Sequence, residues 1–206
     1  MGVSFDLEAV QRAGFPVGAE PLVAIDLADT VMTAVEPARD LLAEPERSAV
    51  WWQLQSGRLP QAAAPPDPAA VRRLRTAIRD LFDAHLEGRV PRQTSVEDVN
   101  AAAASVPRSP RLDFRTTGDV PRTEVRWHTE FGGHVALAYI AGEAIELLGS
   151  PDRLSRLRRC ANPGCSMLFL AETSRRCWCA SNVCGNRVRV ARHQEKVRNA
   201  AAKHGH

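Results

Sequence analysis

Apolar residues recur at helical spacing along much of the first 150 residues. The clearest case is the segment 67–88, in which apolar side chains repeat every three or four residues and charged residues fill positions between them. Asp67 can cap this helix and Gly88 can end it. The segment 135–148 is almost wholly apolar and precedes a glycine and a proline, so it predicts a second helix.

Three other segments have shorter or less regular patterns. The apolar run 21–30 fits either a short strand or the start of a buried helix, because so short a run does not separate the two. Helical patterning follows from Leu41 to about Gly57. Ser95 can cap a further helix that continues to Ala104, with acidic residues in its first turn.

Strand-like alternation occurs in the segments 111–115 and 123–129, which predict a hairpin of two short strands. A Gly-Gly pair at 132–133 ends this hairpin. Residues 152–159 fit a basic helical turn that leads into a cluster of cysteines. The N-terminal part of the chain is therefore predicted to be mainly α with a minor β element.

The charge distribution divides the chain into two parts. Residues 1–150 contain 15 Lys and Arg against 21 Asp and Glu, a net charge of −6, whereas residues 151–206 contain 12 against 3, a net charge of +9. Such asymmetry is typical of a basic appendage that meets a polyanion. Most of the basic residues are Arg, a bias that a GC-rich bacterial genome explains as well as function does. We predict two domains with these same boundaries.

Several classes of protein do not fit the sequence. No run of about 18 apolar residues is present, so we expect no membrane span. The N-terminus carries Asp6 and Glu8 and has no continuous apolar stretch, unlike a secretory signal, so we expect a cytoplasmic protein. We also expect no enzyme, because the chain has neither a Gly-rich phosphate loop nor a nucleophile elbow.

The five cysteines lie close together, and in a reducing cytosol clustered cysteines are typically metal ligands. Cys160 and Cys165 form one pair, Cys179 and Cys184 form another with the same spacing, and 13 residues separate the pairs. Four thiolates with no histidine among them predict one closed, structural zinc site. The fifth cysteine, Cys177, is surplus and could replace Cys179 as a ligand. We favour Cys179 as the ligand, because it preserves the matched spacing of the two pairs.

The surroundings of the cysteines predict a small treble-clef-like finger. The apolar segment 167–170 is a strand candidate, and 176–179 can return beside it. Cys184 then opens a long helix whose first amides can donate to its thiolate. The predicted fold class is thus a helical N-terminal domain plus a small treble-clef-like zinc finger.

The helix that follows Cys184 carries a cationic stripe. At 100° per residue, one arc of about 60° contains Arg189, Arg192, Lys196 and Lys203. A separate arc can pack on the finger and contains Val190, Val197 and Ala201. Arg187 lies outside the stripe, and we expect it to turn back onto the finger. The candidate nucleic-acid contacts are Arg176, Arg187, Arg189, Arg192 and Lys196, although a basic helix face can also be merely solvated, or offset the charge of the zinc site.

These motifs resemble a known family. The name motif of the CGNR zinc finger is present as Cys184-Gly185-Asn186-Arg187. Matching pieces precede it as Cys160-Ala161-Asn162-Pro163 with Cys165, then Leu168-Phe169, then Arg176 and Trp178-Cys179. The resemblance covers about residues 158–200. Where this chain has Cys177, the family usually has a basic residue.

Fingers of this type usually follow an ABATE-type N-terminal domain, which is regarded as a stress-related regulatory region. The segment 21–30 is similar to its opening motif, with Asp26 and Thr30 in matching places and Asp29 where Asn is usual. The resemblance implies a transcriptional regulator that binds double-stranded DNA and holds one structural zinc ion.

The leading hypothesis is therefore an N-terminal domain that senses a small-molecule effector or a protein partner, or that forms a homodimer, joined to a finger that binds DNA. The alternative is a protein-interaction adaptor in which the zinc module is a structural brace. A third hypothesis is an enzyme that uses His128, Glu130 and Asp26. His128, Glu130 and His134 could also form a second metal site, although polar surface residues explain them as well.

Overall fold

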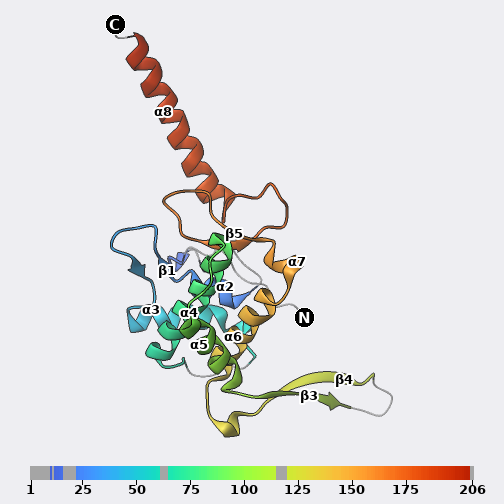
Figure 1. Cartoon of the computed structure of the whole chain (residues 1–206). Helices are drawn as coiled ribbons and strands as arrows, with labels where there is room; N and C mark the ends of the chain where they lie inside the picture. The colour runs from blue at the N-terminus through green and yellow to red at the C-terminus, as the bar shows by residue number, and fades with distance from the viewer. Residues whose placement is uncertain (1–9, 11, 16–21, 61–64, 115–119, 205–206) are drawn as a thin grey trace.

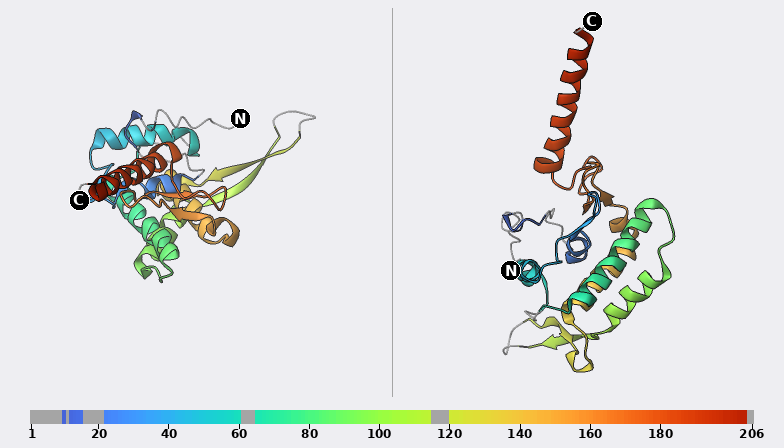
Figure 2. Two further views of the ribbon diagram at one scale, coloured as in Figure 1. Left: turned by 90° about the horizontal axis from the view of Figure 1, so that it is seen from above. Right: turned by 90° about the vertical axis from the view of Figure 1, so that its left-hand side faces the viewer.

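The computed structural model describes residues 10, 12–15, 22–60, 65–114 and 120–204. It is mainly α, with three small antiparallel sheets of two strands each (Figure 1). A body of helices lies in the middle, a two-stranded arm extends from one end, and the helix α8 (Asn186–His204) projects from the other (Figures 1 and 2). None of the helices in the described part of the chain is long and apolar enough to cross a lipid bilayer.

The body is built around one hydrophobic core. Its helices are α2 (Val23–Ala28), α3 (Pro45–Gln55), α4 (Pro68–Glu87), α5 (Gln93–Ala104) and α6 (Val135–Leu148). Helix α2 is buried along its whole length and packs against α4 and α6. The run 21–30, which fitted a strand or a buried helix, thus contains a buried helix.

Helices α4 and α6 agree with their predicted extents. The Asp67 carboxylate accepts a hydrogen bond from the Ala70 amide at 2.8 Å, which caps the start of α4. Gly88 ends α4 with a left-handed backbone, φ 65°, a conformation that favours glycine. Both signals are local in sequence, and this explains why they could be read without a structure.

Helix α3 begins later than its pattern suggested. Leu41 and Leu42 were predicted to be helical, but they follow a short hairpin of β1 (Val31–Met32) and β2 (Arg39–Asp40) and are buried outside any helix. The Asp40 carboxylate accepts a hydrogen bond from the Leu42 amide at 2.8 Å and holds this turn. The apolar spacing therefore reflects a shared core and not a continuous helix.

Helix α5 is capped from another helix. Ser95 was predicted to be the cap, but it lies buried inside α5, which begins at Gln93. Instead, Asp80 of α4 accepts a hydrogen bond from the Arg92 amide at 2.9 Å. Burial acts to raise the pKa of Asp80, but hydrogen bonds from Arg92, Ser95 and Arg89 outweigh it and lower the pKa to about 2. Spacing along the chain cannot reveal a cap that comes from a distant residue.

Replacing Asp80 with alanine should destabilise the body by about 1–2 kcal/mol at pH 7, because the start of α5 loses its cap. The stabilisation is present above the ordinary carboxyl pKa of about 4 and is lost as the pH falls through the folded-state value, so the difference should shrink in acid. Urea unfolding of wild type and Asp80→Ala at pH 7 and at pH 2 measures it. An undiminished difference at pH 2 would contradict the assignment.

The predicted hairpin forms the arm. Its strands are β3 (Arg108–Asp113) and β4 (Arg122–Trp127), which pair antiparallel. Gly132 and Gly133 follow with φ angles of 87° and 80°, which turn the chain into α6.

The third sheet joins the body to the cysteine segment. Residues 152–159 were predicted to be a helical turn, but only the short helix α7 (Pro151–Leu154) forms, and it is followed by β5 (Leu157–Arg159). Strand β5 pairs with β6 (Leu168–Leu170), so the predicted return of 176–179 beside this strand is wrong. The partner of β6 comes from the preceding segment because Leu157 shares the body core with Leu168 and Leu170.

Candidate metal centre and projecting helix

Strand β6 is shared by two hydrophobic clusters. Leu168 and Leu170 are buried in the body core. Phe169 points the other way, into a smaller cluster that contains four of the cysteines. A single short strand therefore ties the finger to the body, and nothing in the periodicity of three residues could have predicted this.

The four cysteines predicted as ligands lie together. The sulfur atoms of Cys160, Cys165, Cys179 and Cys184 are all within 4.8 Å of one another. The Cys165–Cys179 and Cys179–Cys184 sulfur pairs are 3.8 and 3.6 Å apart. A tetrahedral zinc ion with Zn–S bonds of about 2.3 Å requires sulfur–sulfur distances of about 3.8 Å. The cluster fits one zinc ion and, in the described part of the chain, no other group of three or more metal-ligand residues comes together.

Three of the clustered thiols, Cys160, Cys165 and Cys179, have shifted pKa values. Burial raises the pKa of the Cys160 thiol to about 11, while hydrogen bonds from Cys179 and its neighbours lower the pKa of Cys165 to about 5. The hydrogen bond to Cys165, together with burial, raises the pKa of Cys179 well above its ordinary range. Zinc binds thiolates, so binding to this cluster displaces protons.

Two tight turns present the sulfurs. In the first, the Asn162 side chain accepts a hydrogen bond from the Gly164 amide at 3.1 Å, and the Asn162 carbonyl accepts one from the Cys165 amide at 2.9 Å. In the second, the Cys184 amide donates to the Ala180 carbonyl at 2.9 Å within the turn Ser181–Gly185 that starts α8. The zinc cluster thus fixes the point at which the projecting helix leaves the finger.

Arg176 has a structural task inside the finger. Its guanidinium donates to the carbonyls of Cys179, Leu170 and Trp178 at 2.8, 3.2 and 3.3 Å. The same group lies over the Phe169 ring, 4.5 Å from its centroid. Arg176 therefore links β6 to the second cysteine turn, and this structural role does not make it a DNA contact.

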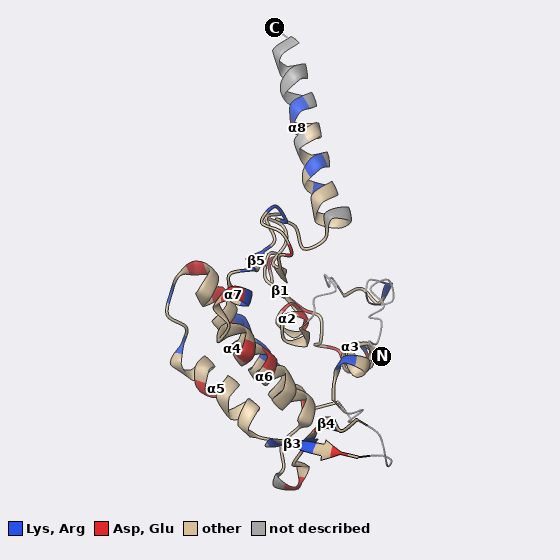
Figure 3. Cartoon of the chain, turned by 90° about the vertical axis from the view of Figure 1, so that its right-hand side faces the viewer, with Lys and Arg blue, Asp and Glu red and all other residues tan. Residues whose placement is uncertain are grey.

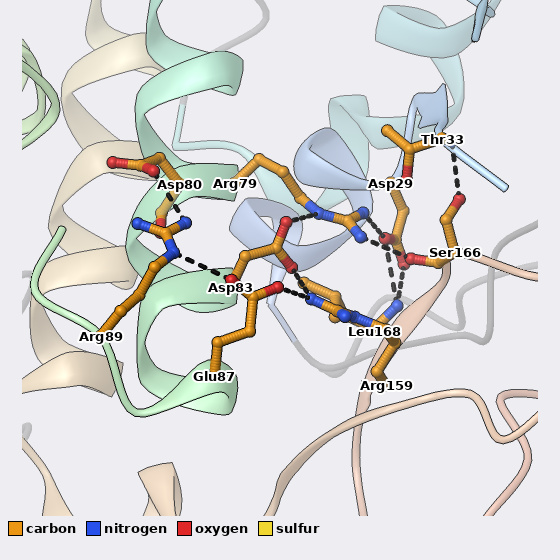
Figure 4. Close-up of polar contacts among 10 residues, drawn as sticks. All are labelled: Asp29, Thr33, Arg79, Asp80, Asp83, Glu87, Arg89, Arg159, Ser166 and Leu168. Carbon is orange, nitrogen blue, oxygen red and sulfur yellow. Dashed lines mark hydrogen bonds and ion pairs between the residues drawn. The ribbon is translucent and has the colours of Figure 1, made fainter. Parts of the chain in front are cut away.

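Polar contacts reinforce the junction between finger and body (Figure 4). The buried carboxylate of Asp29, at the end of α2, accepts hydrogen bonds from the Leu168 amide at 2.9 and 3.1 Å. Arg79 of α4 donates to Asp29 at 3.1 Å and to the Ser166 carbonyl at 2.7 Å. Burial raises the pKa of Asp29 well above its ordinary value, against the opposing effects of Arg79 and the Leu168 amide.

A second set of ion pairs lies at the edge of this junction. Arg159 of β5 reaches Asp83 and Glu87 of α4 at 2.8 and 2.9 Å (Figure 4). Hydrogen bonds from Arg159 and Arg89 lower the pKa of Glu87. Sequence reasoning missed Arg79 and Arg159 as junction residues, because no short-range pattern marks a pairing between α4 and the finger.

The described part of the α8 surface is cationic and mostly exposed. Lys and Arg recur along this helix (Figure 3). Arg187, Arg189 and Lys196 are exposed, while the side chain of Arg192 lies outside the described residues. Arg187 also lines a cavity of about 400 Å³ together with three of the cysteines. The apolar arc was predicted to pack on the finger, but Val190 is 55% exposed because α8 projects away from it. The side chains of Val197 and Ala201, the other members of this arc, lie outside the described residues.

Among the described residues, His128, Glu130 and His134 are not grouped as ligands for a metal ion. His128 contacts Ser109 at 2.9 Å and Glu130 at 3.0 Å, whereas the His134 ring accepts a hydrogen bond from the Ala136 amide at the start of α6. Asp26 is buried and pairs with Arg58. Cys177 is exposed and is not part of the four-sulfur cluster.

A four-cysteine cluster on two tight turns, followed by a long basic helix and fused to a helical body, defines a zinc-finger protein. The family model for the CGNR zinc finger matches residues 156–197. A second model, ABATE, described as "Putative stress-induced transcription regulator", matches residues 22–151, and the chain belongs to this family. No curated protein matches the chain.

Proposed function

We propose that this protein is a transcriptional regulator that binds double-stranded DNA through α8, with the zinc cluster as the scaffold that positions the helix. The observation that carries the proposal is the exposed cationic surface of a helix that projects from the molecule (Figure 1). The name of the matching family, which refers to transcription regulation, supports it.

The charge of the C-terminal part exceeds what the zinc site requires. A zinc ion with four thiolates has a formal charge of −2, whereas residues 151–206 carry a net charge of +9. Neutralising the cluster therefore leaves a large cationic excess for phosphate groups. Phosphate contacts by Arg and Lys supply most of the sequence-independent affinity of DNA-binding proteins.

The shape of α8 suits a groove. The helix has 19 residues and is about 28 Å long, and the major groove of B-DNA admits an α-helix. A helix of this length with little tertiary packing is only marginally stable in water, so contact with a partner would help to order its outer turns. The proposal assigns phosphate contacts to Arg187, Arg189, Arg192 and Lys196.

The body would regulate this helix through the junction. Strand β6 contributes to both cores, and Asp29 at the end of α2 holds its backbone, so a displacement of α2 or α4 would be transmitted to the finger. We propose that an effector or a protein partner acts on the body in this way. In this proposal the protein acts in a reducing, cytoplasmic compartment, by binding and not by catalysis.

The triple variant Arg189→Ala, Arg192→Ala, Lys196→Ala should weaken binding to duplex DNA and retain one zinc ion per chain. Three lost phosphate contacts should reduce the slope of log K against log salt by about 2.7. Fluorescence anisotropy with the full-length, zinc-loaded chain over a salt series measures it. A matched control removes three exposed arginines of the body and arm, Arg72, Arg73 and Arg126, and should leave the slope unchanged.

The adaptor hypothesis predicts the opposite result. Val190 is exposed beside the cations, so α8 could instead dock on a protein groove. If the wild-type chain does not bind duplex DNA even at low salt, the DNA-binding proposal is wrong and the zinc module is a brace for protein contacts.

A further inference from the structure

The arm has one apolar face that little of the protein covers. Alternate residues of a strand share a face, and the register of β3 with β4 puts Pro110 opposite Val125 and Leu112 opposite Thr123. On this face Leu112, Phe114 and Val125 are 60%, 63% and 56% exposed. Contiguous exposed apolar surface on a soluble protein marks a contact surface.

The body covers only the base of this face. Trp127, at the base of the arm, packs with Val106, Val135 and Ala138 and makes an edge contact with the ring of Tyr139, 6.4 Å between centroids. Beyond this point the arm extends past α6 (Figure 1). The outer part of the same face therefore has no support within the described chain.

Most of the charged residues in the two strands of the arm have an opposite charge beside them, and Arg126 faces Ser109. On the opposite, polar face, Arg111 lies across from Glu124 and Asp113 lies across from Arg122. At the base Arg108 forms an ion pair with Glu146 of α6 at 2.9 Å. Since most of these charges are matched across the ladder or on α6, the exposed apolar face is the surface of the arm left for a contact.

The two edges of the arm differ in their capacity to pair. The His128 amide donates to the Pro107 carbonyl at 2.8 Å, so the alternation along the ladder makes Pro110 and Val125 a non-hydrogen-bonded pair. The backbone groups of both residues then point outward. Pro110 has no N–H, which weakens the outer edge of β3. The outer edge of β4 keeps its donors and acceptors at Thr123 and Val125.

We propose that the arm is a homodimerisation element in which the outer edge of β4 pairs antiparallel with β4 of a second copy of this chain. A two-stranded hairpin is marginally stable alone, and this pairing makes a four-stranded sheet. When a strand pairs antiparallel with its own copy, the two chains are related by a two-fold axis. The same edge then serves as the interface on both chains, so the assembly stops at a dimer. The pairing also carries the tip of each arm, with Phe114 and Val120, toward the base of the other, where α6 lies beneath the apolar face.

The test measures the mass of the full-length, zinc-loaded chain without DNA, by light scattering after gel filtration. Wild type should have twice the chain mass of 22.5 kDa. Val125→Pro removes an outward N–H but no bond within the arm, and Leu112→Glu puts a charge on the apolar face; each should give the single-chain mass. Arg126→Ser, on the polar face, is the matched control and should remain dimeric. Zinc content and circular dichroism establish that the variants are folded.

Three outcomes of the mass measurement would overturn the proposal. They are a single-chain mass for wild type, a dimer that survives both Val125→Pro and Leu112→Glu, and growth beyond two chains, which would mean that another edge pairs. Disulfide trapping of single cysteines at positions 122–126 in a Cys177→Ser chain locates the axis, and a dimer with no cross-link in this series also contradicts it. Because DNA is absent, failure here leaves the proposed DNA binding untouched.

Discussion

Replacing Cys179 with serine should abolish zinc binding and unfold the finger. Its sulfur lies 3.8 Å from that of Cys165 and 3.6 Å from that of Cys184, so a tetrahedral site cannot close without it. Structural zinc contributes an apparent 10–16 kcal/mol, about the whole stability of an ordinary domain, to small fingers. Zinc stoichiometry by mass spectrometry, together with thermal unfolding, measures the loss. DNA binding by the variant should fall with it.

Cys177→Ser is the matched control for this substitution. Cys177 is two residues from Cys179 in the sequence, but it is exposed and lies outside the four-sulfur cluster. The variant should retain one zinc ion per chain and the wild-type unfolding temperature. Loss of zinc from Cys177→Ser would reverse the ligand assignment, and DNA binding that persists after complete chelation would refute the scaffold role of the metal.

Removing the junction carboxylate should have the second-largest effect. Asp29→Ala leaves the buried Leu168 amide without its acceptor. It also removes one partner of Arg79, whose guanidinium still contacts Asp83 and the Ser166 carbonyl. Breaking a buried ion pair by removing one partner typically costs about 3–5 kcal/mol. Denaturant unfolding of the zinc-loaded chain measures the change.

Asp29→Asn separates the two parts of this effect. Asn keeps an acceptor for the Leu168 amide but not the charge for Arg79, and burial already acts against that charge. Its cost should therefore be clearly smaller than that of Asp29→Ala. Arg73→Ala breaks an exposed ion pair with Asp98, which solvent screens, and should cost far less than Asp29→Ala. Equal losses for all three variants would show that Asp29 has no special role at the junction.

The sequence predicted features whose causes are local. Asp67 and Gly88 mark the ends of α4 within a few residues, and the matched spacing of the cysteine pairs is sufficient to identify the four-sulfur cluster. Ser95 was misread because the cap of α5 comes from Asp80, on a different helix.

The junction could not be predicted for the same reason. Which strand pairs with β6, and which way Leu168 and Phe169 point, depends on two cores that form only when distant segments meet. The prediction that Val190 of α8 packs on the finger was also wrong, since the periodicity of a helix shows that a face is apolar but not that anything lies against it. Val190 lies on this apolar face of α8 and is exposed.

The strand shared by two cores limits how this protein can be divided. A chain ending after α6 would lose Leu157, Leu168 and Leu170 from the centre of its body, and an excised finger would expose the same leucines to water. We therefore expect neither the body nor the finger to be stable when it is separated from the other. A finger of this kind joined to an unrelated helical body would need matching apolar side chains there to bury Leu168 and Leu170 of β6.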